Sequence, residues 1–431
     1  MAELTKYKLG EIAKIYNGST PSTLDASNYD GNIIWATPKD LSDQNSKYFS
    51  KGARNITQKG FDSCSTQMIP ANNILMSSRA PIGLFAINTV DCCTNQGFKN
   101  IVLDKAIADV DFMYYFLKYH VKEIEALGSG TTFREVSKTA FEKYEISIPS
   151  LPTQQKIASV LSKLDRKISA NREINRNLEE LAKQIYDYWF VQFDFPNEEG
   201  KPYKSSGGKM VYNEVLKREI PAGWEIKKIS SQIKENIGGD WGKEEPEGNY
   251  QLKVSCCRGA DLVSMTDLPT RYILNSNSYK LLEEDDMIVE ISGGSPTQAT
   301  GRCVLISKEI LNSFNNKLIC SNFCQALSIS DKDYVSYFYY MWKMFYNSDV
   351  FFNFEGKTSG IKNFQYDTFV AEKWYFPPKD LAKKFKEIVS QNYMKKCALD
   401  QENKHLAALR DELLPLLMNG QVTLNSCLSA D

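Results

Sequence analysis

The sequence predicts an α+β fold in which two homologous mixed α/β domains are separated by two long antiparallel coiled-coil helices, with pseudo-two-fold repetition. Two long polar-apolar stretches are introduced by prolines, near Leu151 and Leu381. Each follows a block of similar length that is rich in aromatic, Gly and Ser/Thr residues. The opening strand also repeats, because Trp224–Ile229 echoes Tyr7–Ile12. A repeat of this length indicates duplicated domains rather than a solenoid.

These patterns divide the 431 residues into six segments. The strand Tyr144–Pro149 closes the first domain, as Trp374–Pro377 closes the second. The turn-rich segment between the first helix and the second domain has no periodicity and is predicted to be a linker. The predicted segments are domain 1 (1–152), the central spacer helix (153–191), the linker (192–219), domain 2 (220–380), the C-terminal spacer helix (381–420) and a tail (421–431).

Both helical stretches carry a seam with heptad spacing, and the second has apolar ends and a polar middle. A long helix with one apolar seam needs a partner in water. Antiparallel pairing of the two helices is the simplest solution, and dimerisation between chains is the alternative. Polar seam residues would fix the register. The predicted pairing residues are Leu161, Leu164, Ile168, Asn171 and Leu178 in the first helix and Ile388, Lys395, Leu399, Leu406 and Leu413 in the second.

The composition, 42% hydrophobic and 24% charged, is that of a globular protein. No apolar run approaches the roughly 20 residues that span a bilayer, and the first residues lack the apolar stretch of a signal peptide. We therefore expect a cytoplasmic protein with no membrane partner. The net charge of −1 gives no general attraction to nucleic acid, so contact with DNA would need a local basic face. Ten cysteines without a Cys-x-x-Cys pair, and two histidines, favour reduced thiols over a zinc site or disulfides.

Motifs for catalysis are mostly absent. Gly356-Lys-Thr358 lacks the upstream glycine of a phosphate-binding loop, and no Asn-Pro-Pro-Tyr motif of an amino-methyltransferase is present. Glu355-x-Lys357 and Glu225-x-Lys227 have a spacing used by metal-dependent nucleases, but this spacing is common by chance. We therefore predict no catalytic residue, no metal ligand and no bound cofactor in this chain.

Polar, glycine-bearing loops recur in both domains. Arg, Lys, Asn, Gln, Ser and Thr side chains on such loops suit contacts with base edges and phosphates, although ordinary surface turns have the same composition. The loops are 77–83, 94–99 and 128–134 in domain 1, and 292–302, 321–324 and 356–363 in domain 2. The predicted DNA-binding residues are Lys39, Ser77, Arg79, Gln96, Lys99, Thr132, Arg134, Ser295, Gln298, Arg302, Lys357, Lys362 and Asn363.

At these residues the chain resembles the specificity subunits of type I restriction-modification enzymes. The resemblance rests on Ile34-Trp-Ala-Thr-Pro-Lys-Asp-Leu41, Ser77-Ser-Arg-Ala-Pro-Ile-Gly83, Thr94-Asn-Gln-Gly-Phe-Lys99, Ile148–Ile157 and the terminal Leu409–Gly420, and it covers nearly the whole chain. In the second half, Ile291–Pro296, Ser321-Asn-Phe323 and Gly360–Asn363 are similar to another subclass of the same domain. Gln154-Gln155 stands where the family usually has Glu-Gln, and no such pair opens the second helix.

The resemblance implies a non-catalytic subunit that binds double-stranded DNA. Each of the two domains would be a target-recognition domain for one half of a bipartite site, with the helices as a ruler across the spacer. Because the two domains differ in sequence, the site would be asymmetric. Two methyltransferase subunits would bring S-adenosylmethionine and methylate adenine. Two restriction subunits, where they join, would bring ATP and magnesium.

Two other classes of protein remain open from the residues alone. One is a coiled-coil scaffold that binds only proteins, and the other is a stand-alone nuclease. The loops rich in Arg, Asn and Gln favour DNA over the first, and the missing metal and nucleotide motifs speak against the second.

Overall fold

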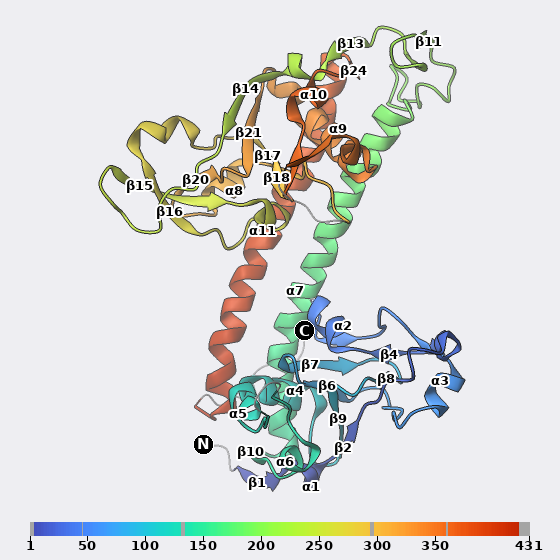
Figure 1. Ribbon diagram of the computed structural model, residues 1–431, viewed down its shortest axis with the longest axis vertical. Coiled ribbons are helices and arrows are strands. Elements are labelled where there is room, and N and C mark those ends of the chain that lie inside the picture. The colour runs from blue at the N-terminus through green and yellow to red at the C-terminus, as the bar shows by residue number, and fades with distance from the viewer. Residues whose placement is uncertain (1–3, 45, 131–133, 294–296, 359–360, 422–431) are drawn as a thin grey trace. The chain divides into compact units, whose positions relative to one another are not determined.

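The computed structural model describes residues 4–44, 46–130, 134–293, 297–358 and 361–421. The chain divides into two compact units, of which unit 1 comprises residues 1–170 with 402–431 and unit 2 comprises residues 171–401. The two long helices are α7 (Leu151–Tyr186) and α11 (Lys379–Met418) (Figure 1). The first part of α7 and the last part of α11 belong to unit 1, and the rest of both helices belongs to unit 2. Within the described ranges, no helix is both long enough and apolar enough to cross a membrane.

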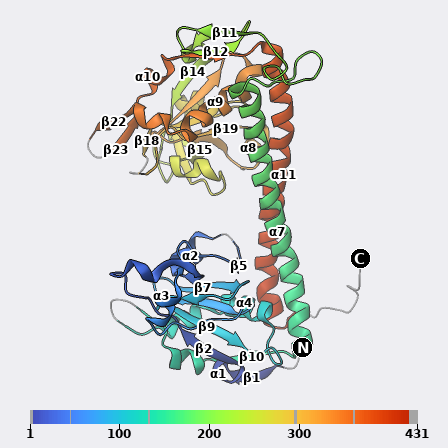
Figure 2. The same cartoon turned by 90° about the vertical axis from the view of Figure 1, so that its right-hand side faces the viewer.

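Unit 1 is built on a five-stranded sheet, part of which is seen in Figure 2. Its strands in spatial order are β2 (Ala13–Asn17), β9 (Phe98–Leu103), β6 (Ile74–Ser78), β7 (Ile82–Asn88) and β5 (Tyr48–Phe49). All neighbours are antiparallel except β5 and β7. Two further pairs are β1 (Thr5–Lys8) antiparallel to β10 (Glu145–Ile148), and β4 (Trp35–Ala36) parallel to β8 (Cys93–Thr94). The remaining elements are β3 (Tyr29–Ile33), α1 (Leu9–Ile12), α2 (Pro38–Asp43), α3 (Gln58–Asp62), α4 (Val110–Tyr119), α5 (Val121–Ala126) and α6 (Lys138–Glu142).

The core of unit 1 lies between this sheet and α4. Phe112, Met113 and Leu117 of α4 are fully or almost fully buried, in one cluster with Ile74 of β6 and Leu161 of α7. The near-helical stripe over residues 111–127 predicts one continuous helix. The structure instead has two, because the backbone of His120 leaves helical geometry between α4 and α5.

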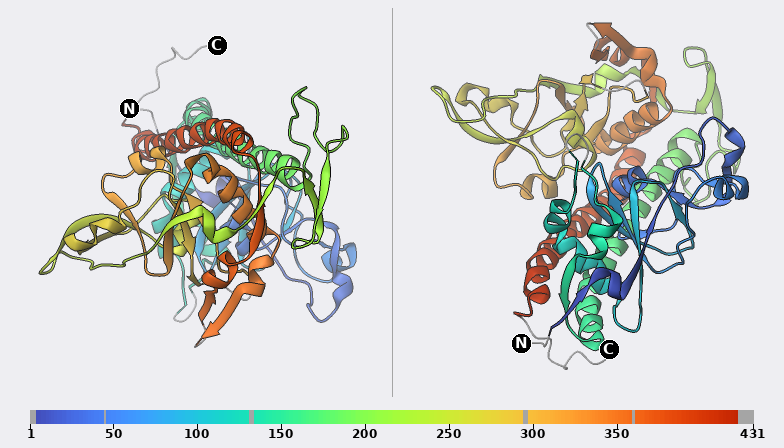
Figure 3. Two further views of the ribbon diagram at one scale, coloured as in Figure 1. Left: turned by 90° about the horizontal axis from the view of Figure 1, so that it is seen from above. Right: turned by 60° about the horizontal axis from the view of Figure 1, so that its bottom comes forward.

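Unit 2 contains a four-stranded antiparallel sheet with the order β14 (Ile233–Gly238), β21 (Cys324–Ile329), β17 (Met287–Glu290) and β19 (Cys303–Leu305). Two three-stranded sheets accompany it. One is β16 (Thr270–Leu274), β15 (Tyr250–Cys257) and β20 (Lys317–Cys320), and the other is β18 (Ser292–Gly293), β23 (Ile361–Phe364) and β22 (Glu355–Thr358). The hairpin β11 (Met210–Asn213) and β12 (Arg218–Pro221) projects from the rest of unit 2 (Figure 3). The remaining elements are β13 (Glu225–Lys228), β24 (Lys373–Phe376), α8 (Lys308–Asn312), α9 (Val335–Asn347) and α10 (Tyr366–Val370).

The strand order of unit 1 is repeated in unit 2. The order β14-β21-β17-β19 corresponds to β2-β9-β6-β7, and the parallel pair β15 and β20 corresponds to the parallel pair β4 and β8. The pair β13 and β24 follows β1 and β10. In unit 1 the amphipathic helix α4 is the next helix after β9, and in unit 2 α9 follows β21 after a short helical turn. The predicted duplication of a mixed α/β domain is therefore confirmed.

The two long helices are antiparallel within each unit. In unit 1, Asp165 of α7 bonds to Arg410 at 2.8 Å, and Lys167 lies 3.5 Å from Glu402. In unit 2, Asn175 donates to Asp400 at 2.6 Å. Partner numbers on α11 fall as residue numbers on α7 rise, which confirms the antiparallel coiled coil. Along α7, the buried or half-buried residues include Leu161, Leu164, Ile168, Asn171 and Leu178, where the sequence places the seam.

The predicted seam of α11 is wrong at two positions. Ile388 is 38% exposed and Lys395 is exposed, whereas Val389 is 5% exposed and Lys396 forms an ion pair with Glu179 of α7. Packing against unit 2 explains the shift by one residue, because Phe385 is fully buried among the rings of that unit. Its ring lies 5.0 Å from Phe190 and 5.6 Å from Tyr340, centre to centre. The half-buried residues Leu399, Leu406 and Leu413 follow the predicted spacing further along the helix.

The corrected seam predicts unequal effects at neighbouring positions. Val389→Ala should lower the free energy of unfolding by about 2 kcal/mol, because it removes buried methyl groups and leaves a cavity. Ile388→Ala should change it by less than about 1 kcal/mol, because the side chain is already partly in water. Urea denaturation of the full chain measures both values. Equal losses for the two variants would contradict the assignment.

Candidate nucleic-acid interface

Three loops of unit 1 meet at the end of β6. The backbone N–H of Ser78 donates to the carbonyl of Gly97 at 2.7 Å, and the N–H of Val136 donates to the carbonyl of Ser78 at 3.1 Å. These bonds join the β6–β7 loop, the turn before β9 and the segment before α6. We call this meeting point, with its three loops, the unit 1 junction. Two of the loops selected from the sequence of domain 1, 77–83 and 94–99, thus lie together, and Val136 two residues beyond the third joins them.

The same arrangement recurs in unit 2 at the end of β17. The N–H of Ile291 donates to the carbonyl of Phe323 at 2.9 Å, and the N–H of Phe364 donates to the carbonyl of Ile291 at 2.8 Å. Ile291 therefore takes the place of Ser78, Phe323 that of Gly97 and Phe364 that of Val136. This is the unit 2 junction, and it joins the three loops selected from the sequence of domain 2.

Several of the predicted DNA-binding residues of unit 1 are exposed at or beside its junction. Gln96 is exposed, and its amide oxygen accepts a hydrogen bond from the Thr20 hydroxyl. The Arg79 side chain is 37% exposed, with its guanidinium 3.8 Å from the Glu135 carboxylate. A β-carbon at Gly97 would lie 3.1 Å from the Pro38 ring and 3.7 Å from Arg79 Nε, so the start of α2, with Lys39, adjoins the junction. Lys39 and Arg134 are both exposed.

Two predicted residues of unit 1 face inward. Ser77 is completely buried, and its hydroxyl donates to the Pro81 carbonyl and accepts from the N–H of Leu84. Lys99 is 5% exposed, and its ammonium lies 3.0 Å from the Glu135 carboxylate. Their burial does not favour direct contact with DNA. We therefore assign them to support of the loop, which corrects the prediction for these two side chains.

In unit 2 two of the three predicted cations, Arg302 and Lys362, are held by carboxylates. The Arg302 guanidinium makes two bonds to Glu290, at 2.6 and 2.9 Å, and the Glu290 side chain is 3% exposed. Hydrogen bonding to Glu290 raises the pKa of Arg302. The Lys362 ammonium lies 2.9 Å from the Glu355 carboxylate, and the Asn363 amide oxygen accepts from the Ser292 hydroxyl at 2.6 Å. These bonds engage all three predicted residues within the unit.

Of the other predicted residues of unit 2, one is exposed and two have side chains outside the described part of the structure. Gln298 is exposed, and its backbone carbonyl accepts a 3.4 Å hydrogen bond from the Lys362 ammonium. Lys357 belongs to β22, but its side chain lies outside the described part of the structure. Ser295, and Thr132 of unit 1, also lie outside the described residues.

Sequence reasoning missed the carboxylates of the two junctions and one aromatic residue. Glu135, Glu290 and Glu355 each hold a predicted cation, although they lie 36, 12 and 7 positions away along the sequence from Lys99, Arg302 and Lys362. Each carboxylate stands beside or within a selected loop, and that proximity was the available signal. Phe323 lies in the selected loop 321–324, but it was not chosen as a DNA-binding residue, because aromatic side chains are more often buried in a core.

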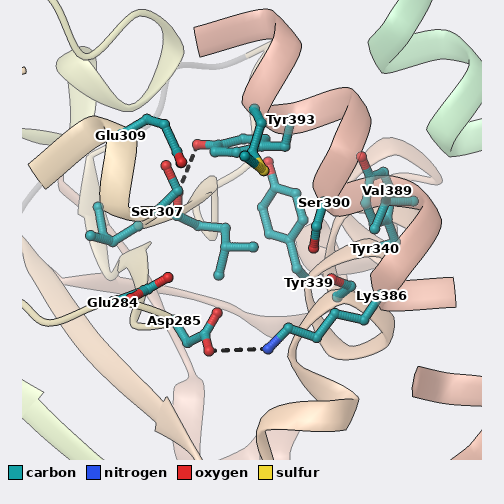
Figure 4. A pocket seen from close by; sticks show the side chains of 14 residues that line it. Glu284, Asp285, Ser307, Glu309, Tyr339, Tyr340, Lys386, Val389, Ser390 and Tyr393 are labelled. Carbon is teal, nitrogen blue, oxygen red and sulfur yellow. Dashed lines mark hydrogen bonds and ion pairs between the residues drawn. The ribbon is translucent and has the colours of Figure 1, made fainter. Parts of the chain in front are cut away.

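A cavity of 150 Å³ lies at the opposite end of β17 from the unit 2 junction, between α9, α11 and the turn before β17. The Lys386 ammonium of α11 lies 3.1 Å from the Asp285 carboxylate in this cavity (Figure 4). The same ammonium donates to the Lys332 carbonyl at 2.8 Å. The Tyr393 hydroxyl donates to the Leu305 carbonyl at 3.0 Å. These contacts attach the spacer helix to the domain.

The Glu290–Arg302 pair gives a prediction for stability. Glu290→Gln should lower the free energy of unfolding by about 3 kcal/mol, because it leaves a largely buried guanidinium without its counter-charge. Glu247→Gln is the matched control, since Glu247 pairs with Lys243 at the surface and such pairs contribute at most about 1 kcal/mol. Urea denaturation of both variants measures the difference. A small loss for Glu290→Gln would contradict the supporting role of the pair.

Comparison with known proteins groups the chain with one family. Residues 1–180 match the family model of the type I restriction modification DNA specificity domain. The type I restriction enzyme MjaIX specificity subunit of Methanocaldococcus jannaschii is 30% identical over 434 residues, covering 96% of this chain and 92% of that protein. The EcoR124I/EcoR124II specificity subunit of Escherichia coli is 29% identical over 203 residues, which are 44% of this chain and 48% of that protein.

A solved structure shares the fold. The crystal structure of the S subunit of a type I restriction-modification system from M. genitalium superposes with a TM-score of 0.58 at 18% sequence identity, and the match covers 96% of both chains. With the near full-length relative from M. jannaschii, these findings establish that the chain belongs to the specificity subunits of type I restriction-modification enzymes.

Proposed function

We propose that this chain is the non-catalytic DNA reader of its complex and binds a bipartite, asymmetric site, one half at each junction. The observation that carries the proposal is the duplication of the junction. The same backbone hydrogen bonds recur at Ser78 and Ile291, with different side chains around them. Two junctions with a common backbone and different side chains would read two different half-sites.

The exposed side chains suit this task. The Arg79 guanidinium can donate two hydrogen bonds to the O6 and N7 atoms of guanine, and the Gln96 or Gln298 amide can pair with adenine. Lys39 and Arg134 would instead contact phosphates, which position the protein without reading sequence. Because the net charge of the chain is −1, this local placement of cations is what would attract DNA.

The family supports a set of partners. Two methyltransferase subunits would dock on the paired helices and the bases of the domains, and would bring S-adenosylmethionine for methylation of adenine. Two restriction subunits, with ATP and magnesium, would join for cleavage. In this proposal α7 and α11 set the spacing between the half-sites. Methylation requires extrusion of the target base, so the duplex must be distorted while both half-sites are held.

An adenine-methylation map tests the proposal most directly. Long-read sequencing of cells with the cognate methyltransferase should show a bipartite, asymmetric motif only when this chain is present. Exchange of residues 1–152 for those of another family member should then change one half of the motif and leave the other half unchanged. Unchanged methylation, although the chain and the methyltransferase are associated, would contradict the proposal and favour a protein-binding scaffold.

A single substitution tests the unit 1 junction. Arg79→Ala should weaken binding of the complex to its site by about 1–3 kcal/mol and relax one base position, if the guanidinium reads a base. Lys105→Ala is the control, because Lys105 is exposed beyond the other end of β9. Competition binding with duplexes altered at each position measures the effect. Loss of affinity that is even across all sequences would show that Arg79 contacts phosphate only.

A further inference from the structure

The turn before β21 presents a phenylalanine where unit 1 has a glycine. The Phe323 carbonyl accepts hydrogen bonds from the N–H groups of Ile291 at 2.9 Å and Ser292 at 3.2 Å. The Gly97 carbonyl accepts the equivalent bond from Ser78 at 2.7 Å. The two residues therefore share one backbone position in the repeated fold. Unit 1 has no side chain at that position, and unit 2 has a benzyl group.

The Phe323 ring is half in water although its backbone is firmly held. The side chain is 50% exposed, while Ser321 and Cys324 on either side are completely buried. The N–H of Ser321 donates to Cys257 at 2.8 Å, and the N–H of Cys324 donates to Ser321 at 2.9 Å. Among the described residues, Phe323 belongs to none of the buried hydrophobic clusters and to none of the ring pairs. A rigid turn thus presents an apolar group at the unit 2 junction.

Two of the predicted cations of the unit 2 junction are already engaged by carboxylates. Arg302 is bonded to Glu290, and Lys362 to Glu355, so these cations are less available to base edges than Arg79 in unit 1. Single exposed apolar side chains are common on protein surfaces. What distinguishes Phe323 is its place at the junction, where its counterpart in unit 1 adjoins exposed polar residues. Phe323 therefore offers unit 2 an apolar contact at a position where unit 1 has no side chain.

We propose that Phe323 is a specificity-determining residue that reads a thymine in the second half-site by apolar contact with its 5-methyl group. Among the major-groove edges, thymine alone carries a methyl group, and phenylalanine is one of the side chains that contact it. The inference rests on the proposed function, because it assigns a base to one residue of the same junction. It also gives the second half-site a means of readout by apolar contact, in addition to the hydrogen bonds that Gln298 can make.

Replacement of single thymines by deoxyuridine tests the contact, since it removes only the methyl group. The complex of this chain with its methyltransferase is titrated onto duplexes that carry the methylation motif and one such replacement. One position in the half-site read by unit 2 should weaken binding by the wild-type chain roughly fourfold, the value of one buried methyl group. Phe323→Ala should bind the thymine and uracil duplexes equally. Phe323→Leu, which stays apolar, should keep part of the difference.

Tyr212→Ala is the matched control, because Tyr212 is a 54% exposed aromatic residue on the projecting β11–β12 hairpin. It should keep the full uracil effect. The proposal is overturned if no thymine-to-uracil replacement in that half-site weakens binding by the wild type. It is also overturned if Phe323→Ala keeps the wild-type preference for thymine over uracil, whether its affinity is unchanged or is lowered by the same factor on every duplex. In each of these outcomes the wild type still binds its motif, whereas failure of the proposed function would appear earlier, as the absence of any methylation motif.

Discussion

The two junctions depend on backbone hydrogen bonds made by one residue at the end of a central strand, Ser78 in β6 and Ile291 directly after β17. Ser78 and Ile291 each donate one bond and accept another, and each thereby ties two remote loops to the sheet. Buried backbone groups need such partners, so the loops are fixed by bonds that any side chain permits. Side chains on the loops can therefore change without loss of the fold. This separation of scaffold from reader is what a family of differing DNA specificities requires.

Carboxylates decide which cations of a junction remain exposed. In unit 2, Glu290 forms an ion pair with Arg302, and Glu355 forms one with Lys362. In unit 1, the Glu135 carboxylate lies 3.0 Å from the Lys99 ammonium but 3.8 Å from the Arg79 guanidinium. A largely buried cation requires such a partner, because desolvation of an unpaired charge is costly. The two units thus place different chemical groups at equivalent backbone positions. Unit 2 presents an exposed ring at Phe323, the position at which unit 1 has Gly97.

The sequence predicts the architecture well because duplication and helix period are properties of long segments. It also selects glycine-rich polar stretches that the structure places at or beside the two junctions. Single residues are harder to predict. Composition does not distinguish the exposed Arg79 from the paired Arg302, whose partner Glu290 lies in another strand. Heptad spacing likewise selects Ile388 over Val389, because it contains no information on the rings that pack around Phe385 in unit 2.

In unit 1 a chain of polar contacts connects the recognition domain to its helices. The buried Lys47 ammonium lies 2.5 Å from Asp111 and 2.9 Å from the Ser162 hydroxyl of α7. The Tyr115 hydroxyl of α4 donates to Asp165 of α7, which also binds Arg410 of α11. Burial, with the neighbouring Asp165 charge, raises the pKa of Tyr115. Because these groups are costly to leave unpaired, the domain is held in one orientation on its helix pair. A recognition domain grafted onto these helices must therefore supply its own equivalents of Lys47, Asp111 and Tyr115 to remain aligned with them.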